Sequence, residues 1–156
     1  MAWLVPIRGI LPWDNATSAE FLDNEDIPAP STDSSGSGRL LWTQTSLRKF
    51  WDLLLELRKN QALGLLGISF HVARQSKQQS IASMLSLPSQ PPSLGLSVVD
   101  YIKVYHDAPN TLLVRNVLDI WQYVYQTEDG QTKKIRMLKG SKLVLLDAVS
   151  RAVQLS

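Results

Sequence analysis

Residues 120–138, IWQYVYQTEDGQTKKIRML, decide the fold class because they predict a β-hairpin in the C-terminal half of the chain. Asp129 and Gly130 lie between two runs of strand-forming residues, and both tolerate the positive φ of a type I′ turn. A two-residue turn pairs Glu128 with Gln131 and so sets the register of the hairpin. One face then carries Ile120, Val124, Ile135 and Met137, and the other carries Trp121, Tyr123, Tyr125, Lys134, Arg136 and Leu138. We expect the first face to belong to the core and the second to form a contact surface.

One amphipathic helix is predicted over about residues 47–60. Its apolar residues recur at the i, i+3, i+4, i+7 spacing that places them on one side of a helix, and its charged residues fall outside that stripe. Thr45 or Ser46 is placed to cap its N-terminus.

The remaining segments predict further strands around the hairpin. Alternating or continuous apolar runs indicate strands over residues 63–73, 98–105 and 111–117. Residues 142–146 form either a last buried strand or the start of a terminal helix that continues through Val153. The sequence therefore predicts an α+β fold, with an antiparallel sheet weighted to the C-terminal half and one main helix.

Three regions divide the chain: residues 1–25 are an apolar and acidic N-terminal arm, residues 26–38 a flexible linker or loop, and residues 39–156 a single α+β domain. The arm has too many prolines for a central strand. It either docks on a partner subunit or closes over the core of its own domain. The residues expected to make that contact are Trp3, Leu4, Ile7, Ile10, Leu11 and Trp13.

Charge is unevenly distributed along the chain. Residues 1–38 hold one base and six acids, whereas residues 39–156 hold fifteen bases and eight acids. A basic body favours an anionic partner such as nucleic acid, and ordinary scatter of charges in a small protein remains the alternative.

Catalytic and metal-binding patterns do not occur in the sequence. The chain has no cysteine, and neither His71 nor His106 has a second ligand at metal-binding spacing, so both histidines are interpreted as structural. Serine nucleophile motifs and phosphate-binding glycine loops are also missing. We expect a protein that is not an enzyme and that has no metal, cofactor or small-molecule substrate.

Aromatic and basic side chains on one hairpin face are the residue types that hold single-stranded nucleic acid, by stacking on bases and neutralising phosphates. The same residues could instead stabilise each other across the strands or bury against a partner protein. The residues expected to bind RNA or a partner are Arg115, Trp121, Tyr123, Tyr125, Lys133, Lys134, Arg136, Lys139 and Lys142.

Three separated motifs add a family resemblance over about residues 40–146. Leu40-Leu41-Trp42 comes first, the stretch from Phe70 to Pro88 with Lys77-Gln78-Gln79 comes second, and the third consists of Leu112-Leu113-Val114-Arg115, Asp129-Gly130-Gln131 and Ser141-Lys142-Leu143-Val144. In this order they resemble the small accessory subunit of subtype III-D CRISPR effector complexes, which are RNA-guided assemblies of antiviral defence. Thr43 stands where that family usually has glycine.

The resemblance implies a non-catalytic subunit that packs against the RNA-holding subunits of its complex. Other subunits and either guide or target RNA would be its partners, and cleavage would be done by its neighbours. Because Pro6, Arg8 and Pro12 interrupt the first apolar run, we expect a cytoplasmic protein without a membrane span. The alternative is a stand-alone adaptor or regulator whose acidic arm binds one protein partner.

Overall fold

The computed structural model describes residues 1–23, 39–73, 95–127 and 129–155 of the 156-residue chain. The strands are β1 (Ala2–Ile10), β2 (Ser18–Phe21), β3 (Arg39–Trp42), β4 (Gly67–His71), β5 (Asp100–Tyr105), β6 (Tyr123–Gln126), β7 (Thr132–Ile135), β8 (Val144–Leu146) and β9 (Ala152–Leu155). The helices are α1 (Gln44–Asn60) and α2 (Thr111–Ile120). The predicted linker at residues 26–38 and residues 74–88 of the second motif lie outside the described residues.

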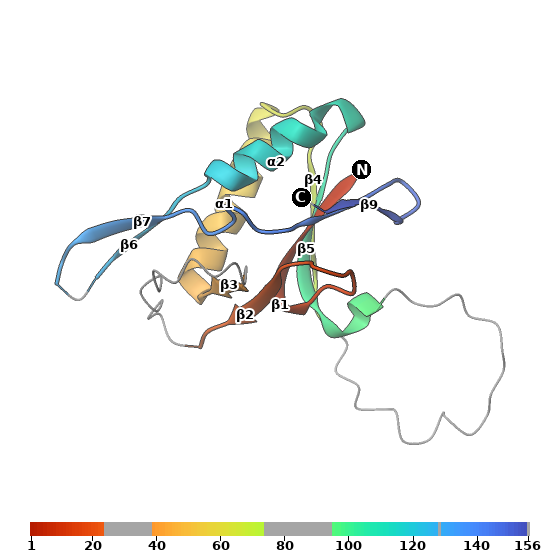
Figure 1. The fold of residues 1–156 in the computed structure, drawn as a ribbon. Coiled ribbons are helices and arrows are strands. Elements are labelled where there is room, and N and C mark those ends of the chain that lie inside the picture. The colour runs from red at the N-terminus through yellow and green to blue at the C-terminus, as the bar shows by residue number, and fades with distance from the viewer. Residues whose placement is uncertain (24–38, 74–94, 128, 156) are drawn as a thin grey trace, which may run out of the picture.

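The sheet is built around β1, which pairs antiparallel with β5 along most of its length, with β8 at its start and with β2 at its end. β4 pairs antiparallel with β5, and β3 runs parallel to β2. Four strands thus lie in the spatial order β8-β1-β5-β4, joined in the chain order β1-α1-β4-β5-α2-β8. This is the connectivity of a ferredoxin-like β-α-β-β-α-β unit. The strands β2, β3, β6, β7 and β9 are additions to it (Figure 1).

Two hydrophobic clusters lie on opposite faces of this sheet. The larger cluster joins Trp3 and Ile102 of the strands to Phe50 of α1 and Leu118 of α2, so both helices cover the same face. On the other face Leu4 and Tyr101 belong to a smaller cluster that includes no residue of α1 or α2. Because strand side chains alternate between faces, β1, β5 and β8 each contribute to both clusters.

The predicted α+β class with a mainly antiparallel sheet is confirmed. Helix α1 confirms the amphipathic helix and extends it to Gln44. Its cap is Thr43 rather than Thr45 or Ser46: the Thr43 hydroxyl accepts a hydrogen bond from the Ser46 N–H at 3.2 Å, and the Ser46 hydroxyl accepts one from the Thr43 N–H at 2.9 Å. This reciprocal capping box satisfies two donors at the helix start.

The strand predicted over residues 111–117 is wrong, because these residues form α2. Val114 and Leu118, one helical turn apart, are buried against the core, while Leu112 and Leu113 are exposed. The strands predicted over residues 63–73 and 98–105 exist as the shorter β4 and β5. At the C-terminus β8 and β9 confirm the strand alternative, so the terminal helix is wrong.

The N-terminal arm is also a correction, because it is the central strand of the domain's own sheet. Trp3, Leu4, Ile7 and Leu11 are at most 2 % exposed. Trp13 is half-buried beside the smaller cluster, and only Ile10 of the six arm residues is exposed. Of the two alternatives, packing on the same domain is confirmed, and docking of this apolar surface on a partner is wrong.

Pro6 is tolerated in the central strand because no neighbouring strand lies where a backbone N–H of this residue would point. The Pro6 carbonyl accepts a hydrogen bond from Trp42 Nε1 at 3.0 Å. Since the N–H and C=O of a strand residue point to the same side, the position of the missing N–H also faces Trp42. On that side β1 pairs with β8 only through residues 2–4 and with β2 only through Gly9 and Ile10. The proline therefore breaks no sheet hydrogen bond.

Among the described residues, no helix is long and apolar enough to cross a membrane.

Candidate nucleic-acid interface

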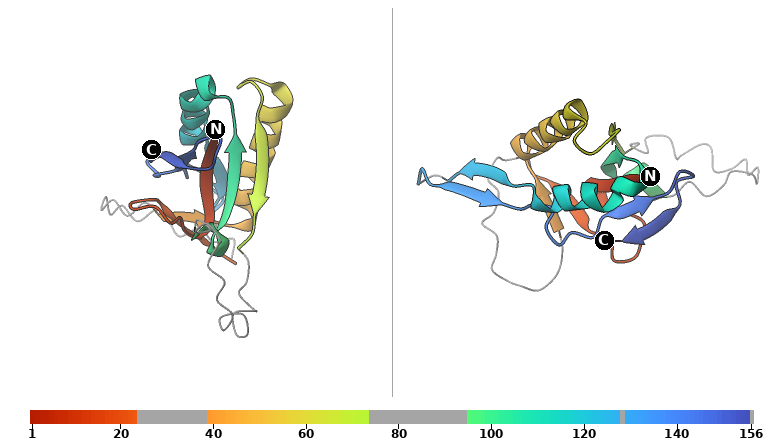
Figure 2. Two further views of the ribbon diagram at one scale, coloured as in Figure 1. Left: turned by 90° about the vertical axis from the view of Figure 1, so that its right-hand side faces the viewer. Right: turned by 90° about the horizontal axis from the view of Figure 1, so that it is seen from above.

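The hairpin of β6 and β7 projects away from the rest of the domain (Figure 1; Figure 2, right). Its base is attached to α1 by Lys49, whose Nζ donates a hydrogen bond to the Val124 carbonyl at 2.9 Å and lies 5.2 Å from the centroid of the Tyr123 ring. Lys49 is not among the binding residues predicted from the sequence. The sequence gives one indication of its role: Lys49 falls outside the apolar stripe of the helix, so its side chain does not enter the core.

The register of the hairpin differs by one residue from the predicted register. Tyr123 pairs with Ile135, Tyr125 with Lys133 and Gln126 with Thr132. The Thr127 N–H donates to the Gln131 carbonyl at 2.9 Å, so the loop between these two residues is longer than the predicted two-residue turn. Within this loop Gly130 has a φ of 73°, as in hairpin loops that end in a glycine bulge.

This shift redistributes the side chains between the two faces. Tyr123 and Tyr125 share their face with Lys133 and Ile135, whereas Lys134 lies on the face of Val124. Arg136 follows the end of β7 at Ile135, outside the paired residues. The predicted face that combined the tyrosines with Lys134 and Arg136 is therefore wrong, and the positive charges lie on both faces. Leu138, which was expected on the contact face, is buried, and Ile120 is exposed at the end of α2.

Aromatic rings connect the hairpin to the core. Trp121 packs against Phe50 and Trp42, with centroid separations of 4.9 and 6.2 Å, and Tyr123 stacks on Tyr125 at 5.7 Å. Trp121 is half-buried and Tyr123 is only 3 % exposed. These two rings are positioned to hold the hairpin on the domain. Tyr125 is half-buried and lies further out on the hairpin.

Five basic side chains give the hairpin and its flanks a positive field. All five are exposed, and among the described residues none of them forms an ion pair. They are Lys133, Lys134, Arg136, Lys139 and Lys142. Exposed lysine and arginine side chains that are not committed to local carboxylates can pair with phosphates at little desolvation cost.

Arg115 is not part of this surface, because the structure places it in the interior. Its guanidinium forms an ion pair with Asp119 at 2.7 Å and donates a hydrogen bond to the Ser141 carbonyl at 2.6 Å. It also lies 5.9 Å from the centroid of the Trp3 ring. Burial lowers the Arg115 pKa from its usual value, and Asp119 opposes that shift. The side chain therefore links α2 to β1 and to the turn before β8.

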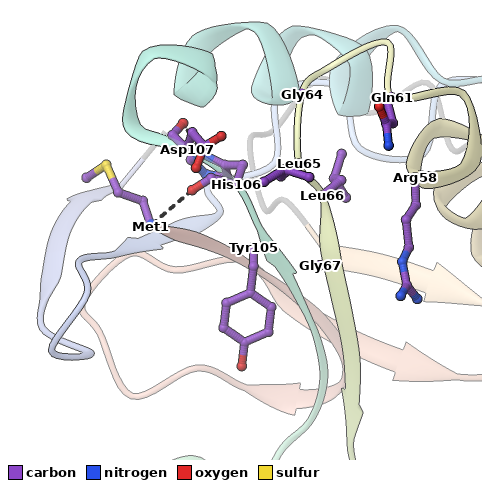
Figure 3. A pocket seen from close by; sticks show the side chains of 10 residues that line it. All are labelled: Met1, Arg58, Gln61, Gly64, Leu65, Leu66, Gly67, Tyr105, His106 and Asp107. Atoms are coloured by element: carbon purple, nitrogen blue, oxygen red, sulfur yellow. Dashed lines mark hydrogen bonds between the residues drawn. The ribbon is translucent and has the colours of Figure 1, made fainter.

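A cavity of about 490 Å³ lies near the start of β4 and the end of β5 (Figure 3). His106 lines it and is 5 % exposed, and its Nδ1 lies 3.0 Å from the Asp107 carbonyl oxygen. Burial lowers the pKa of His106, so the imidazole is neutral at pH 7. Among the described residues no group of three histidine, aspartate or glutamate side chains could hold a metal ion. The structural role of His106 stays a prediction.

We compared the chain with protein-family models, with curated proteins and with solved structures, and none of these comparisons found a match.

Proposed function

We propose that this protein is a non-catalytic subunit of an RNA-guided CRISPR type III-D effector complex, and that its β6–β7 hairpin contacts RNA or the subunit that holds the RNA. The observation that carries the proposal is the projecting hairpin, whose exposed lysine and arginine side chains form no ion pair with any described residue. The motif resemblance supports this family, and the basic body of the chain supports an anionic partner.

The chemistry of the hairpin favours contact with a phosphate backbone over reading of bases. Lys133 lies on one face and Lys134 on the other, with the exposed Arg136 just after β7, so phosphates can be neutralised from both sides. Trp121 and Tyr123 are engaged with α1 and the core, which leaves Tyr125 as the hairpin ring with the most accessible position. Contacts to phosphates fix the position of a protein on RNA but carry no sequence information.

The test removes three positive charges of the hairpin in one variant, with Lys133→Gln, Lys134→Gln and Arg136→Gln. A matched control removes three exposed positive charges of α1, with Arg48→Gln, Arg58→Gln and Lys59→Gln. Tagged protein is purified from cells that contain the complex, and the co-purified subunits and RNA are quantified. The hairpin variant should lose subunits and RNA, while the control should retain both.

Binding of the isolated protein to single-stranded RNA provides a second measurement. If each of the three basic side chains of the hairpin neutralises one phosphate, the slope of log K against log salt concentration should be less steep by about 2 in the hairpin variant. A hairpin variant that assembles and retains RNA as the wild type does would refute the role of the hairpin.

The adaptor alternative depended on the arm as its docking element. If the arm were a separate docking element, removal of residues 1–38 should abolish the partnership and leave the fold intact. Because this deletion removes β1 and β2, it would destroy the sheet. The structure thus offers this alternative no separable arm.

A further inference from the structure

The second surface of interest is the face of β4 and β5 that points away from the helices. Ile68, Ile102 and Val104 belong to the cluster under α1 and α2. Strand alternation therefore turns the residues between them to the opposite face. The left view of Figure 2 looks onto this face, with α1 behind β4 and β5. Its side chains are Ser69 and His71 from β4 and Tyr101, Lys103 and Tyr105 from β5.

The Tyr105 ring lies over β4, because its cross-strand partner is Gly67. A Cβ atom at residue 67 would lie 3.2 Å from Tyr105 Cβ and 3.4 Å from Cδ2, so any larger residue would displace the ring. The Tyr105 hydroxyl is 3.5 Å from Ser69 Oγ, which shows that the ring extends along β4. It nevertheless remains 41 % exposed. The glycine thus lets an aromatic ring rest on the strand and leaves the ring partly open to solvent.

His71 continues this row of side chains. Its Nε2 lies 2.8 Å from Ser69 Oγ, and its ring stacks on Tyr101 with a centroid separation of 4.7 Å and an interplanar angle of 9°. Burial and the neighbouring Lys103 lower the pKa of His71, which keeps the ring neutral at pH 7. The stacked and hydrogen-bonded ring is held in place before any ligand arrives.

The charge of this surface is positive. Lys103 lies beside Ser69 in the strand register, with its Nζ 5.6 Å from the centroid of the Tyr105 ring. None of the five side chains that form the surface is a carboxylate. Single-stranded nucleic acid binds where bases can stack on exposed rings and a cation can pair with a phosphate. This surface has partly exposed, fixed rings next to a cation, and none of its own side chains opposes that charge. A protein partner would need no such cation between two rings, and the basic body of the chain also favours a polyanion.

We propose that this face of β4 and β5 binds single-stranded RNA, with bases stacked on Tyr105 and His71 and a phosphate paired with Lys103. The inference rests on the proposed function for the identity of the ligand as RNA, but it assigns a binding surface separate from the hairpin. An RNA held here lies against the sheet, whereas the hairpin reaches a different part of the RNA or of the complex.

The experiment measures binding of a fluorescent single-stranded RNA to the full chain by anisotropy at low salt. Tyr105→Ala should weaken binding by about 5-fold to 150-fold, which corresponds to one lost stacking contact. Tyr105→Phe should bind as the wild type does, because the ring is retained. The matched control is Phe70→Ala: Phe70 is 42 % exposed on the same pair of strands, but it lies on the helix side.

Crosslinking locates the contact independently of affinity. RNA that contains 4-thiouridine should crosslink to Tyr105 or His71 on irradiation, as mapped by mass spectrometry. Equal binding by Tyr105→Ala and the wild type, or a larger loss with Phe70→Ala, would overturn the inference. Loss of binding in Tyr105→Ala together with unchanged binding and assembly in the hairpin variant would support this surface and refute the hairpin contact. The reverse pattern would do the opposite.

Discussion

Replacement of Trp121 by alanine tests whether the aromatic residues of the hairpin base act in stability or in ligand contact. The ring lies 4.9 Å from Phe50 and 6.2 Å from Trp42, between the last turn of α2 and β6. Trp121→Ala removes these two ring pairs and a third one with Tyr123 at 6.5 Å, and it leaves a space beside two buried aromatic residues. The hairpin would then be attached to the domain mainly through Tyr123 and Lys49.

The magnitude follows from the contacts. A fully buried tryptophan replaced by alanine costs about 3–5 kcal/mol, and the half-buried position of Trp121 places its cost near the lower end. Three aromatic pairs at about 0.5–1.5 kcal/mol each account for a large part of this sum. We therefore expect the free energy of unfolding to fall by about 3 kcal/mol. In a domain of this size that corresponds to a decrease in Tm of about 6–12 °C.

Thermal unfolding followed by circular dichroism measures this decrease directly. Ile120→Ala is the matched control, because Ile120 is the preceding residue but is 60 % exposed, and its replacement should change stability by less than about 0.5 kcal/mol. A Trp121→Ala variant that melts within about 2 °C of the wild type would refute the structural role. If such a variant also lost RNA binding, Trp121 would be a ligand contact, as the sequence pattern first indicated.

Three further predictions concern the fold. Thr43→Ala removes the capping hydroxyl of α1 and should lower the free energy of unfolding by about 1 kcal/mol in urea titrations, whereas Gln44→Ala should have little effect. Arg115→Met leaves the Asp119 carboxylate without its cation and should cost about 3 kcal/mol; an unchanged urea midpoint would contradict the interior ion pair. Burial lowers the pKa of His106 below its usual 6.5, so the unfolded chain binds more protons and stability should fall as the pH drops below about 6.5. His106→Gln should reduce this loss in urea titrations between pH 7.5 and 5.5, and an identical loss in both proteins would assign it to other groups.

Local patterns predicted the elements whose stability is encoded within a few residues. Helix α1 has an unambiguous apolar stripe, and Asp129-Gly130 correctly located the hairpin loop. The predicted register is wrong because Asp-Gly fits both a two-residue turn and a longer loop in which only the glycine takes a positive φ. The segment that forms α2 was predicted as a strand because its sequence, TLLVRNVLDI, has enough adjacent aliphatic residues to fit a buried strand as well as a helix.

Pairing between distant segments could not be predicted from such patterns. Pro6 argued against a central strand, and only its position in the gap between β8 and β2 makes it compatible with one. Similarly, Tyr105 and His71 come from separate strands, and nothing local to either strand shows that Gly67 lies opposite Tyr105. The basic residues of the hairpin were identified from sequence, whereas their distribution over two faces depended on the register.

The position of β1 has a consequence for how the chain folds as it is synthesised. Its main partners are β5 and β8, which follow it by about ninety to one hundred and thirty residues. At a synthesis rate of about 5–20 residues per second, β8 appears roughly 7–30 s after β1. Until β5 has been synthesised, the part of β1 that contains Trp3, Leu4, Val5 and Ile7 has no strand to pair with, although α1 can already form. Folding should therefore be completed late, and truncation before residue 100 should yield a nascent chain that exposes its first strand to chaperones and to aggregation.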